Sequence, residues 1–448
     1  MAEGSAAAPI GASSWLSATL NGSGDWKLRS LIPYLFGLIM LFDSWDSVVI
    51  AFTLPSIAKA WSLDPLRGGW LISSGYAGQL IGAVVCGALA EAKGRLPLLR
   101  TLVITMCVLA VACGLAQDYG QLVALRLLQG VAIGGALPVA ISYLNEVAPA
   151  ATRGRFFGTY QFLMVSGFGL ASLCSAYVVP AFGWRPMYML GAAPLLVAPF
   201  LFAVPESPRW LAGRGRVPDA FEALVKLGGR PVAADAEAAP ATPKRPSVMV
   251  LLSPRLRGLT LVTSLLWLLT SLVSFGLVTW VPSIYVSNFH IPIARSLQYN
   301  AIASVFVLII PLVLRQTIDR FGRRPPVILG TAIGGVALLA LTQVDHSQEH
   351  LVVGLTILGQ IGVSIGSMVL WPYSSEVFET NVRASALGAM SSLARAASMS
   401  TPLVVGGVLA ATGSITPVFL IFGLSAASVA LLWIFATRET AGRELDAH

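Results

Sequence analysis

The sequence has little charge for its length. Only 11% of its 448 residues are Asp, Glu, Lys or Arg, and the mean hydropathy is +0.76. A soluble domain carries about 25% charged residues, so this chain has too few to cover a globular surface. The composition excludes an ordinary soluble domain and predicts an all-α membrane protein.

Cysteine and histidine are also scarce, with four residues of each. The cysteines (Cys86, Cys107, Cys113 and Cys174) all fall inside apolar runs, where we expect buried small side chains and no disulfide framework or metal cluster. The histidines fall in polar loops or at the tail. The sequence also shows no nucleotide-binding glycine loop and no nucleophile–base pair. We therefore expect no cofactor and no enzymatic activity.

Long apolar runs take the place of the missing charge. They recur along the whole chain, and most approach the roughly 20 residues that a helix needs to cross a bilayer. The first fourteen residues have neither a basic nor an apolar region, so we expect no cleavable signal peptide. The twelve predicted transmembrane helices are 31–56, 69–90, 97–116, 121–144, 156–179, 186–204, 258–284, 299–317, 326–342, 350–373, 384–410 and 415–436.

Basic residues lie almost entirely on one side of these predicted spans. With the N-terminus in the cytoplasm, the only lysines and arginines in loops on the opposite side are Lys59, Arg67, Arg185 and Arg295. Such a positive-inside bias predicts that both termini are cytoplasmic. The net charge of +8 therefore reflects the orientation of the chain in a lipid bilayer and does not indicate nucleic-acid binding. We interpret this bilayer as a bacterial inner membrane.

The longest hydrophilic stretch divides the spans six and six. It covers 205–255 and begins with a segment around 217–227 that predicts a short amphipathic helix at the membrane surface. The Ala- and Pro-rich remainder predicts a flexible linker. The expected organisation is an N-terminal half over 1–204, this cytoplasmic linker, and a C-terminal half over 256–448.

The two halves repeat each other. YLNEVAPAATRGRFFG at 143–158 returns as YSSEVFETNVRASALG at 373–388, with Tyr, Glu, Val, Arg and Gly coinciding at an offset of 230. The loops GALAEAKGRLP and RQTIDRFGRRPP agree at an offset of 228. Two pseudo-symmetric six-helix halves are the parallel-repeat architecture of major facilitator transporters, which this chain resembles.

Charged clusters recur at the cytoplasmic helix ends. Glu91 and Arg95 in the first half correspond to Asp319, Arg320 and Arg323 in the second. An acidic side chain near one helix end and an arginine on the next helix can form a charge-assisted latch. We predict a conformation-dependent latch in each half, and not a basic loop that only sets topology.

A second pair of charged motifs follows the fourth and tenth spans. Glu146 precedes Arg153, and Glu376 precedes Arg383, at the same spacing. We predict that each glutamate belongs to a cytoplasmic gate with the arginine that follows it.

Further motifs extend the resemblance to the major facilitator superfamily over the whole chain. They are ALRLLQGVAIGGALP in the fourth span and PESPRWL after the sixth. The sugar-porter and organic-ion branches share PESPRWL, so this motif indicates the superfamily and not the substrate. The resemblance implies a transporter that works by alternating access, and we expect a monomer.

An arginine inside the eleventh span indicates the sign of the substrate. Arg395 lies nineteen positions after the glutamate of Y-x-x-E-V in the tenth span. In the organic cation and anion transporters that this region resembles, cation carriers have aspartate there and anion carriers arginine. The resemblance implies a carboxylate bound to Arg395 and contacted by Gln161, although Arg395 could instead pair with an internal carboxylate.

Aromatic side chains near the predicted site favour a planar substrate. The candidates are Tyr160 in the fifth span, Trp267 and Phe275 in the seventh, and Trp371 in the tenth. Aromatic rings offer large apolar area at low entropic cost, although in membrane helices they more often pack or anchor. We expect Trp267 and Trp371 to contact the substrate.

Two aspartates interrupt the first span, in LFDSWDSVVIAF. Asp43 and Asp46 are i, i+3 neighbours on one helix face, and Arg126 in the fourth span is their expected partner. Two carboxylates this close do not easily both ionise in a low dielectric, so we predict a proton-coupling site, with a structural Asp–Arg pair as the alternative. D-S-W-D resembles the D-G-x-D motif of aromatic acid/proton symporters, with Ser44 in place of glycine.

These motifs together resemble the bacterial niacin transporter group most. The resemblance implies proton-coupled import of a small aromatic carboxylate, with nicotinate as the expected substrate. The alternative is an aromatic acid/proton symporter for benzoate, hydroxybenzoate or protocatechuate. A drug/proton antiporter and a membrane sensor that does not transport are further alternatives.

Overall fold

The protein is built from helices throughout the part of the chain that its computed structural model describes. The first long helix begins at Lys27, and the last ends at Phe435. The described residues are 16, 19–21, 26–149, 152–229, 248–345 and 348–440.

Ten of the described helices are long and apolar enough to cross a membrane. Local sequence signals set several of their ends. α3, for example, begins at Pro65 after Asp64, whose side chain caps the helix by accepting a hydrogen bond from the Arg67 amide at 2.8 Å. The ten are α2 (Lys27–Trp61), α3 (Pro65–Lys93), α4 (Arg95–Leu115), α5 (Tyr119–Val147), α6 (Arg153–Phe182), α11 (Arg257–Ser287), α12 (Ile293–Phe321), α14 (Glu349–Val377), α15 (Thr380–Thr412) and α16 (Thr416–Phe435).

Two shorter apolar segments complete the set. α13 (Arg324–Ala340) is one continuous helix over the ninth predicted span. The sixth predicted span, 186–204, is not continuous and was wrong as a single helix. It divides into α7 (Arg185–Leu190), η1 (Ala193–Leu196) and α8 (Ala198–Leu201), because prolines 194 and 199 each start a new turn and lack the amide that would continue the previous one.

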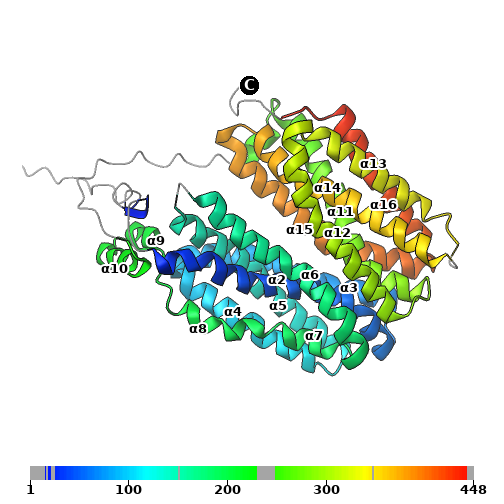
Figure 1. Cartoon of the computed structure of the whole chain (residues 1–448), viewed down its shortest axis with the longest axis horizontal. Helices are drawn as coiled ribbons and strands as arrows, with labels where there is room; N and C mark the ends of the chain where they lie inside the picture. Colours follow the sequence, from blue (N-terminus) through cyan, green and yellow to red (C-terminus); the bar gives the residue numbers. More distant parts are fainter. Residues whose placement is uncertain are drawn as a thin grey trace, which may run out of the picture.

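The helices form two bundles that lie side by side (Figure 1). α2 to α8 make the first bundle, and α11 to α16 make the second. The predicted all-α fold is confirmed in the described residues, and the helices divide into two bundles as the internal repeat predicts.

Short helices lie beyond the membrane-spanning part at one end of the first bundle. α9 (Pro208–Gly213) and α10 (Val217–Leu227) pack on each other, and α10 occupies the segment where the sequence predicts a helix. η2 (Val248–Leu252) precedes the second bundle. We call the end that carries α9 and α10 the linker end, and the opposite end, where α2 stops at Trp61, the far end.

The two bundles share a core only toward the far end. One hydrophobic cluster there joins residues of α2, such as Val49 and Phe52, to residues of α11, such as Leu277 and Trp280. Toward the linker end each bundle has a cluster of its own, around Tyr143 in the first and around Tyr373 in the second. The described chain is therefore closed at the far end, while its bundles separate toward the linker end (Figure 1).

Small residues bring α3 and α15 into close contact at the far end. A Cβ atom added to Gly69 would lie 2.6 Å from the Pro402 carbonyl oxygen, and one added to Gly406 would lie 2.5 Å from that of Pro65. Nearby, the Ser73 hydroxyl donates a hydrogen bond of 2.7 Å to the carbonyl of Met399. This closure depends on two positions that have no side chain.

Replacing Gly69 with valine should open the far end. The added methyl groups overpack the contact with α15, and overpacking costs about 1–3 kcal/mol, a shift of roughly 5- to 150-fold in a two-state equilibrium. In a chain whose native cysteines are replaced by alanine, Gly69→Val should speed thiol labelling of a Ser73→Cys reporter several-fold.

The matched control for this experiment is Gly87→Val on the same helix. A Cβ atom at Gly87 meets nothing within 4 Å, so this change should leave the labelling rate as it was. Equal labelling rates in the two variants would show that the glycine contact does not hold the far end closed.

Candidate functional site

The two aspartates of α2 lie buried at the middle of the membrane-spanning region. Asp43 and Asp46 lie near the middle of α2 and are 6% and 0% exposed. Within the described chain, Asp43 Oδ1 and both carboxylate oxygens of Asp46 have no hydrogen-bond partner. Unpartnered buried carboxylate oxygens are costly, which makes this a candidate for a site where a proton or a ligand completes the bonding.

Asp46 points into the first bundle. Its Oδ1 lies against Gly191 so closely that a Cβ atom there would collide with it. Arg126 of α5 is buried beside it and interacts with it electrostatically. Arg126 Nη1 donates to the main-chain oxygen of Asp46 at 3.0 Å and to Gln129 Oε1 at 2.8 Å. The predicted partners are thus brought together, but the hydrogen bond from Arg126 goes to the backbone and not to a carboxylate.

Asp43 lies toward the other bundle. It interacts electrostatically with the half-buried guanidinium of Arg395, which projects from α15. Tyr160 of α6 is the third member of this group, because its buried hydroxyl interacts electrostatically with Asp43 and has no hydrogen-bond partner among the described residues. Asp43 and Arg395 therefore interact across the boundary between the bundles, although no ion pair within 4 Å joins them in the described structure.

The predicted aromatic residues are divided between packing and exposed positions. Trp267 of α11 is buried, donates from Nε1 to Ser374 Oγ at 2.9 Å, and meets the ring of Trp371 edge-on with centroids 4.7 Å apart. Trp371 itself is 49% exposed. Phe275 meets Tyr76 of the other bundle edge-on at 5.8 Å.

Gln161 of α6 has an exposed side chain, next in sequence to the buried Tyr160. Trp371 and Gln161 are therefore the more accessible of the predicted substrate contacts. The buried Trp267 packs edge-on against the ring of Trp371.

This arrangement of charges suits an organic anion. A guanidinium presents a planar fork that matches a carboxylate, and the neighbouring Asp43 can hold or release a proton. If Asp43, Asp46, Arg126 and Arg395 are all ionised, their formal charges cancel. A bound monoanion would leave one negative charge in excess, and one added proton would restore neutrality.

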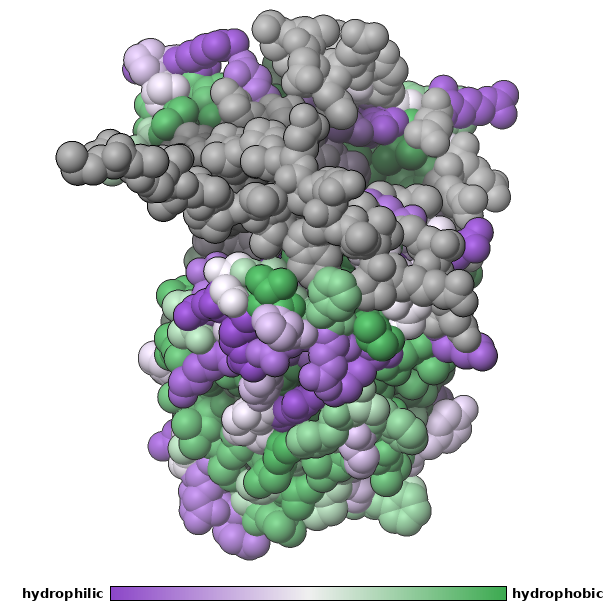
Figure 2. Space-filling view, turned by 90° about the vertical axis from the view of Figure 1, so that its left-hand side faces the viewer, coloured by the Kyte–Doolittle hydropathy of each residue, from purple (hydrophilic) through white to green (hydrophobic). Residues whose placement is uncertain are grey.

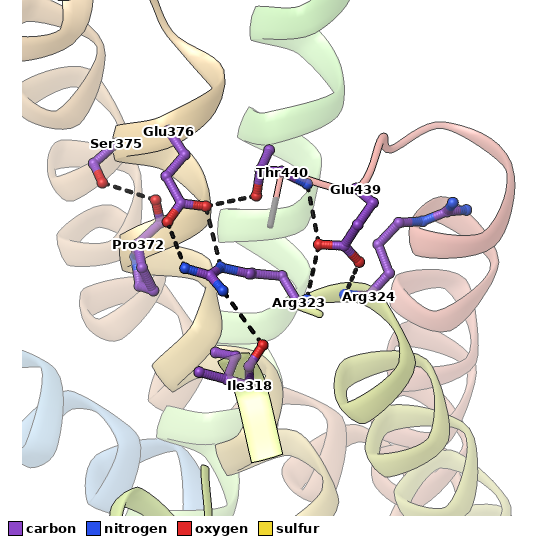
Figure 3. Close-up of polar contacts among 8 residues, drawn as sticks. All are labelled: Ile318, Arg323, Arg324, Pro372, Ser375, Glu376, Glu439 and Thr440. Carbon is purple, nitrogen blue, oxygen red and sulfur yellow. Dashed lines mark hydrogen bonds and ion pairs between the residues drawn. The ribbon is translucent and has the colours of Figure 1, made fainter. Parts of the chain in front are cut away.

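A second set of charges braces the linker end of the second bundle (Figure 3). The Arg323 guanidinium donates two hydrogen bonds to the Glu376 carboxylate, from Nη2 to Oε1 at 2.9 Å and from Nε to Oε2 at 3.2 Å. Glu439 accepts from the backbone amides of Arg323 and Arg324 at 2.9 and 3.0 Å. The Thr440 hydroxyl donates to Glu376 Oε2 at 2.6 Å. This cluster joins the start of α13 to the end of α14 and to the chain after α16.

The first bundle contains a matching cluster. Arg95 pairs with Glu146 at 3.0 Å, and Glu206 accepts from the backbone amide of Leu96 at 3.1 Å. Burial raises the pKa of Glu206 above its ordinary value, while its hydrogen bonds from the Ser207 and Leu96 amides act in the opposite direction. The repeat seen in the sequence therefore extends to the contacts.

The structure corrects the predicted gate pairs. Glu146 pairs with Arg95, because the loop after α3 folds under the end of α5. Glu376 pairs with Arg323 in the same way, because the loop after α12 folds under the end of α14. The side chain of Arg153 is exposed, and Arg383 donates to the Phe378 carbonyl at 3.3 Å.

The remaining latch residues also differ from the prediction. The backbone carbonyl of Glu91 accepts a hydrogen bond from Trp210 Nε1 at 2.9 Å, whereas the predicted latch would use the Glu91 carboxylate. Arg320 is exposed beside the ring of Phe321, and the side chain of Asp319 lies outside the described residues. The ion pairs that do form, Arg95 with Glu146 and Arg323 with Glu376, lie inside each bundle and use the predicted arginines with other acidic partners.

Comparison with known proteins shows the family of the chain. The sequence profile described as "Sugar (and other) transporter" matches residues 31–448. The chain belongs to that family.

Several curated relatives of this transporter are named for aromatic carboxylates. It is 29% identical over 428 residues to the niacin transporter NiaP of Acinetobacter baylyi, covering 94% of this chain and 96% of the relative. It is also 29% identical over 433 residues to a gallate transporter of Pseudomonas putida, covering 95% and 94%. A benzoate transport protein of A. baylyi is 26% identical over 399 residues, covering 83% and 82%.

Solved structures confirm the fold of the transporter. The crystal structure of a D-xylose-proton symporter matches with a TM-score of 0.73 at 20% identity, covering 93% of this chain and 99% of that one. The protein is therefore a multi-pass membrane transporter of the major facilitator type and not an enzyme.

Glu206 and Glu439 are members of the site that the sequence reasoning missed. A signal was present, because Glu206-Ser207 and Glu439-Thr440 are the same acidic-hydroxyl pair after the last helix of each half. Glycines make room for both carboxylates. Gly94 and Gly322 adopt φ of +103° and +86°, and a Cβ atom at either would strike the glutamate.

Removing the Glu439 carboxylate should destabilise the transporter. Glu439→Ala leaves the first amides of α13 without their acceptor, a loss of about 1–3 kcal/mol for buried groups. The apparent melting temperature of the purified protein in detergent should fall by several degrees.

Glu222→Ala is the control for this substitution. Among the described residues Glu222 pairs with the exposed Lys226 on α10, and such an i, i+4 pair is worth about 0.3–0.5 kcal/mol. If both substitutions lower the melting temperature equally, the cluster around Glu439 does not brace the bundle.

Proposed function

We propose that this transporter imports a small aromatic carboxylate together with a proton, and that its substrate is nicotinate. The observation that carries the proposal is the position of Arg395 on α15, within electrostatic range of the buried Asp43 of α2 across the boundary between the bundles. It sets a permanent cation, which can bind a carboxylate, beside an acid that can titrate.

The names of the relatives support an aromatic acid as the substrate class. Nicotinate, gallate and benzoate each combine a planar ring with a carboxylate, and proteins named for all three resemble this chain. In the proposed complex the carboxylate lies on Arg395, Gln161 hydrogen-bonds it, and the ring stacks near Trp371.

A benzoate-like or gallate-like acid is the second candidate. D-S-W-D in α2 resembles the signature of aromatic acid/proton symporters, and the gallate transporter matches as much of the chain as the niacin transporter does. The two candidates differ in the ring and not in the mechanism.

The proposed mechanism is alternating access. We take the linker end as cytoplasmic, as the positive-inside bias predicts, so this conformation opens toward the cytoplasm of a bacterial cell. The two halves, 1–204 and 256–448, rock about the central site while the intra-bundle clusters around Arg95 and Arg323 keep each half rigid.

Asp43 is the proposed proton carrier. Protonation removes its attraction for Arg395 and frees the guanidinium for the substrate. Anion and proton then cross together without adding net charge to the interior, where uncompensated charge is costly. Asp46, enclosed in the first bundle with Arg126, maintains the charge balance there.

Uptake into proteoliposomes tests the proposed substrate class. Purified protein should accumulate labelled nicotinate when an inward proton gradient is imposed, and unlabelled nicotinate should compete better than benzoate, protocatechuate or nicotinamide. Transport of benzoate or protocatechuate without nicotinate would establish the second candidate.

Arg395→Ala is the variant that examines the carboxylate assignment. Loss of a charge-assisted bidentate contact worth about 1.5–3 kcal/mol should weaken substrate binding roughly tenfold or more. Undiminished nicotinate binding by this variant, or no uptake of any anion by the wild type, would contradict the role given to Arg395.

A further inference from the structure

A polar cavity lies at the linker end of the first bundle, outside the transport site. It has a volume of about 530 Å³ and sits where the start of α2 meets the start of α6. Two arginines line it, Arg29 and Arg155, with hydroxyls from Ser30, Thr152 and Thr159. α2 begins beside α9 and α10, so the cavity is near the left-hand end of the molecule in Figure 1.

Arg29 is held in this cavity with one nitrogen unused. It is only 2% exposed. Nε donates to the Val147 carbonyl at 2.7 Å and Nη1 to the Leu20 carbonyl at 2.6 Å, while the guanidinium lies 4.3 Å from the ring centroid of Trp26. Nη2 is buried without a hydrogen-bond partner among the described residues. The side chain is thus fixed by two hydrogen bonds and a ring contact, and Nη2 is left without a hydrogen bond in the described structure.

The charge of Arg29 is also uncompensated within the described structure. No acidic residue is among those that line the cavity, and the charged side chain that acts on Arg29 most is another arginine, Arg209. A buried cation without a counter-charge costs several kcal/mol, so an anion in the cavity would offset the charge of Arg29 and its repulsion from Arg209.

We propose that this cavity binds a phosphate group, and that the phosphate is the headgroup of an acidic phospholipid. Arg29 and Arg155 supply the charge. The Ser30 and Thr159 hydroxyls already donate to the carbonyls of Lys27 and Arg155, so the two arginines carry the recognition. The apolar rim points to a lipid source: Leu31 and Tyr34, 60% and 53% exposed, stand within the first eight residues of α2, at the linker end of this membrane-spanning helix. Basic pockets among aromatic and apolar side chains at this depth bind acidic headgroups.

The phosphate site is separate from the transport site. Arg29 and Asp43 are fourteen residues apart on α2, and at a rise of 1.5 Å per residue this places them about 21 Å apart along the helix. The site spans α2 and α6, which pack along their lengths in the first bundle and both contact the second. A lipid bound there would join the two helices at their linker ends.

Because the two sites are separate, failure of the proposed nicotinate transport would leave the phosphate site unaffected.

Figure 2 views the linker end of the molecule and shows hydrophilic side chains gathered in the middle of the described face, with hydrophobic ones beside them. A headgroup at this end would therefore meet polar side chains while its acyl chains follow neighbouring apolar surface. This is the environment expected for a phospholipid at the edge of the bilayer.

Binding of short-chain lipids to the delipidated full chain in detergent tests the proposal. The probes are dioctanoyl phosphatidylglycerol, dioctanoyl phosphatidylcholine and inorganic phosphate, and the readouts are native mass spectrometry and the melting temperature. Phosphatidylglycerol should bind saturably and raise the melting temperature, whereas phosphatidylcholine should bind weakly. Arg155→Gln should weaken phosphatidylglycerol binding about tenfold, from the loss of one charge-assisted contact.

Arg257→Gln is the matched control, because Arg257 opens α11 at the start of the second bundle and is exposed. Arg29→Lys is a second variant, which keeps the charge but loses the planar fork of donors, and it should also weaken phosphatidylglycerol binding. Inorganic phosphate binding as tightly as phosphatidylglycerol would keep the site and assign it to a soluble phosphate. No preference for phosphatidylglycerol over phosphatidylcholine together with no phosphate binding, or equal binding by Arg155→Gln and Arg257→Gln, would overturn the proposal.

Discussion

Four ionisable side chains in the middle of a membrane protein, three buried and one half-buried, constrain the structure around them. Asp43, Asp46, Arg126 and Arg395 sit where a single uncompensated charge is expensive, so they must balance one another. Three of them belong to the first bundle, and Arg395 belongs to the second. The balance therefore depends on how the bundles meet, which couples the electrostatics of the site to the conformation of the whole molecule.

The packing divides the molecule along its length in a way that suits this coupling. At the far end a shared core and the glycine contacts of Gly69 and Gly406 hold the bundles together. At the linker end each bundle has its own core and its own charged brace. Rigid halves with one closed end and one divided end are the parts that alternating access requires.

Much of this fold could be predicted from the sequence, because apolar runs of membrane length leave few alternatives. The helix at Val217–Leu227 and the meeting of Asp46 with Arg126 followed from spacing and residue type. The broken segment after Arg185 did not, because overall hydropathy hides the interruptions that Pro194 and Pro199 impose.

The contacts of the charged clusters were predicted less well. Glu146 was expected to pair with Arg153, which follows it in sequence, but Arg95 reaches it from fifty-one positions upstream. Such a pairing depends on how loops fold beneath the helices, and proximity in sequence does not report that. The internal repeat contained the missing information, since Glu206 and Glu439 stand in equivalent places and make equivalent bonds.

The coupling of proton to anion through Asp43 is the central claim, and proton flux is its most direct measurement. A pH-sensitive dye outside proteoliposomes would report whether protons enter when nicotinate is added without an imposed gradient. Wild-type protein should take up protons with nicotinate, and Asp43→Asn should exchange nicotinate without moving protons. Proton uptake undiminished in Asp43→Asn, at an unchanged ratio to nicotinate, would contradict the claim.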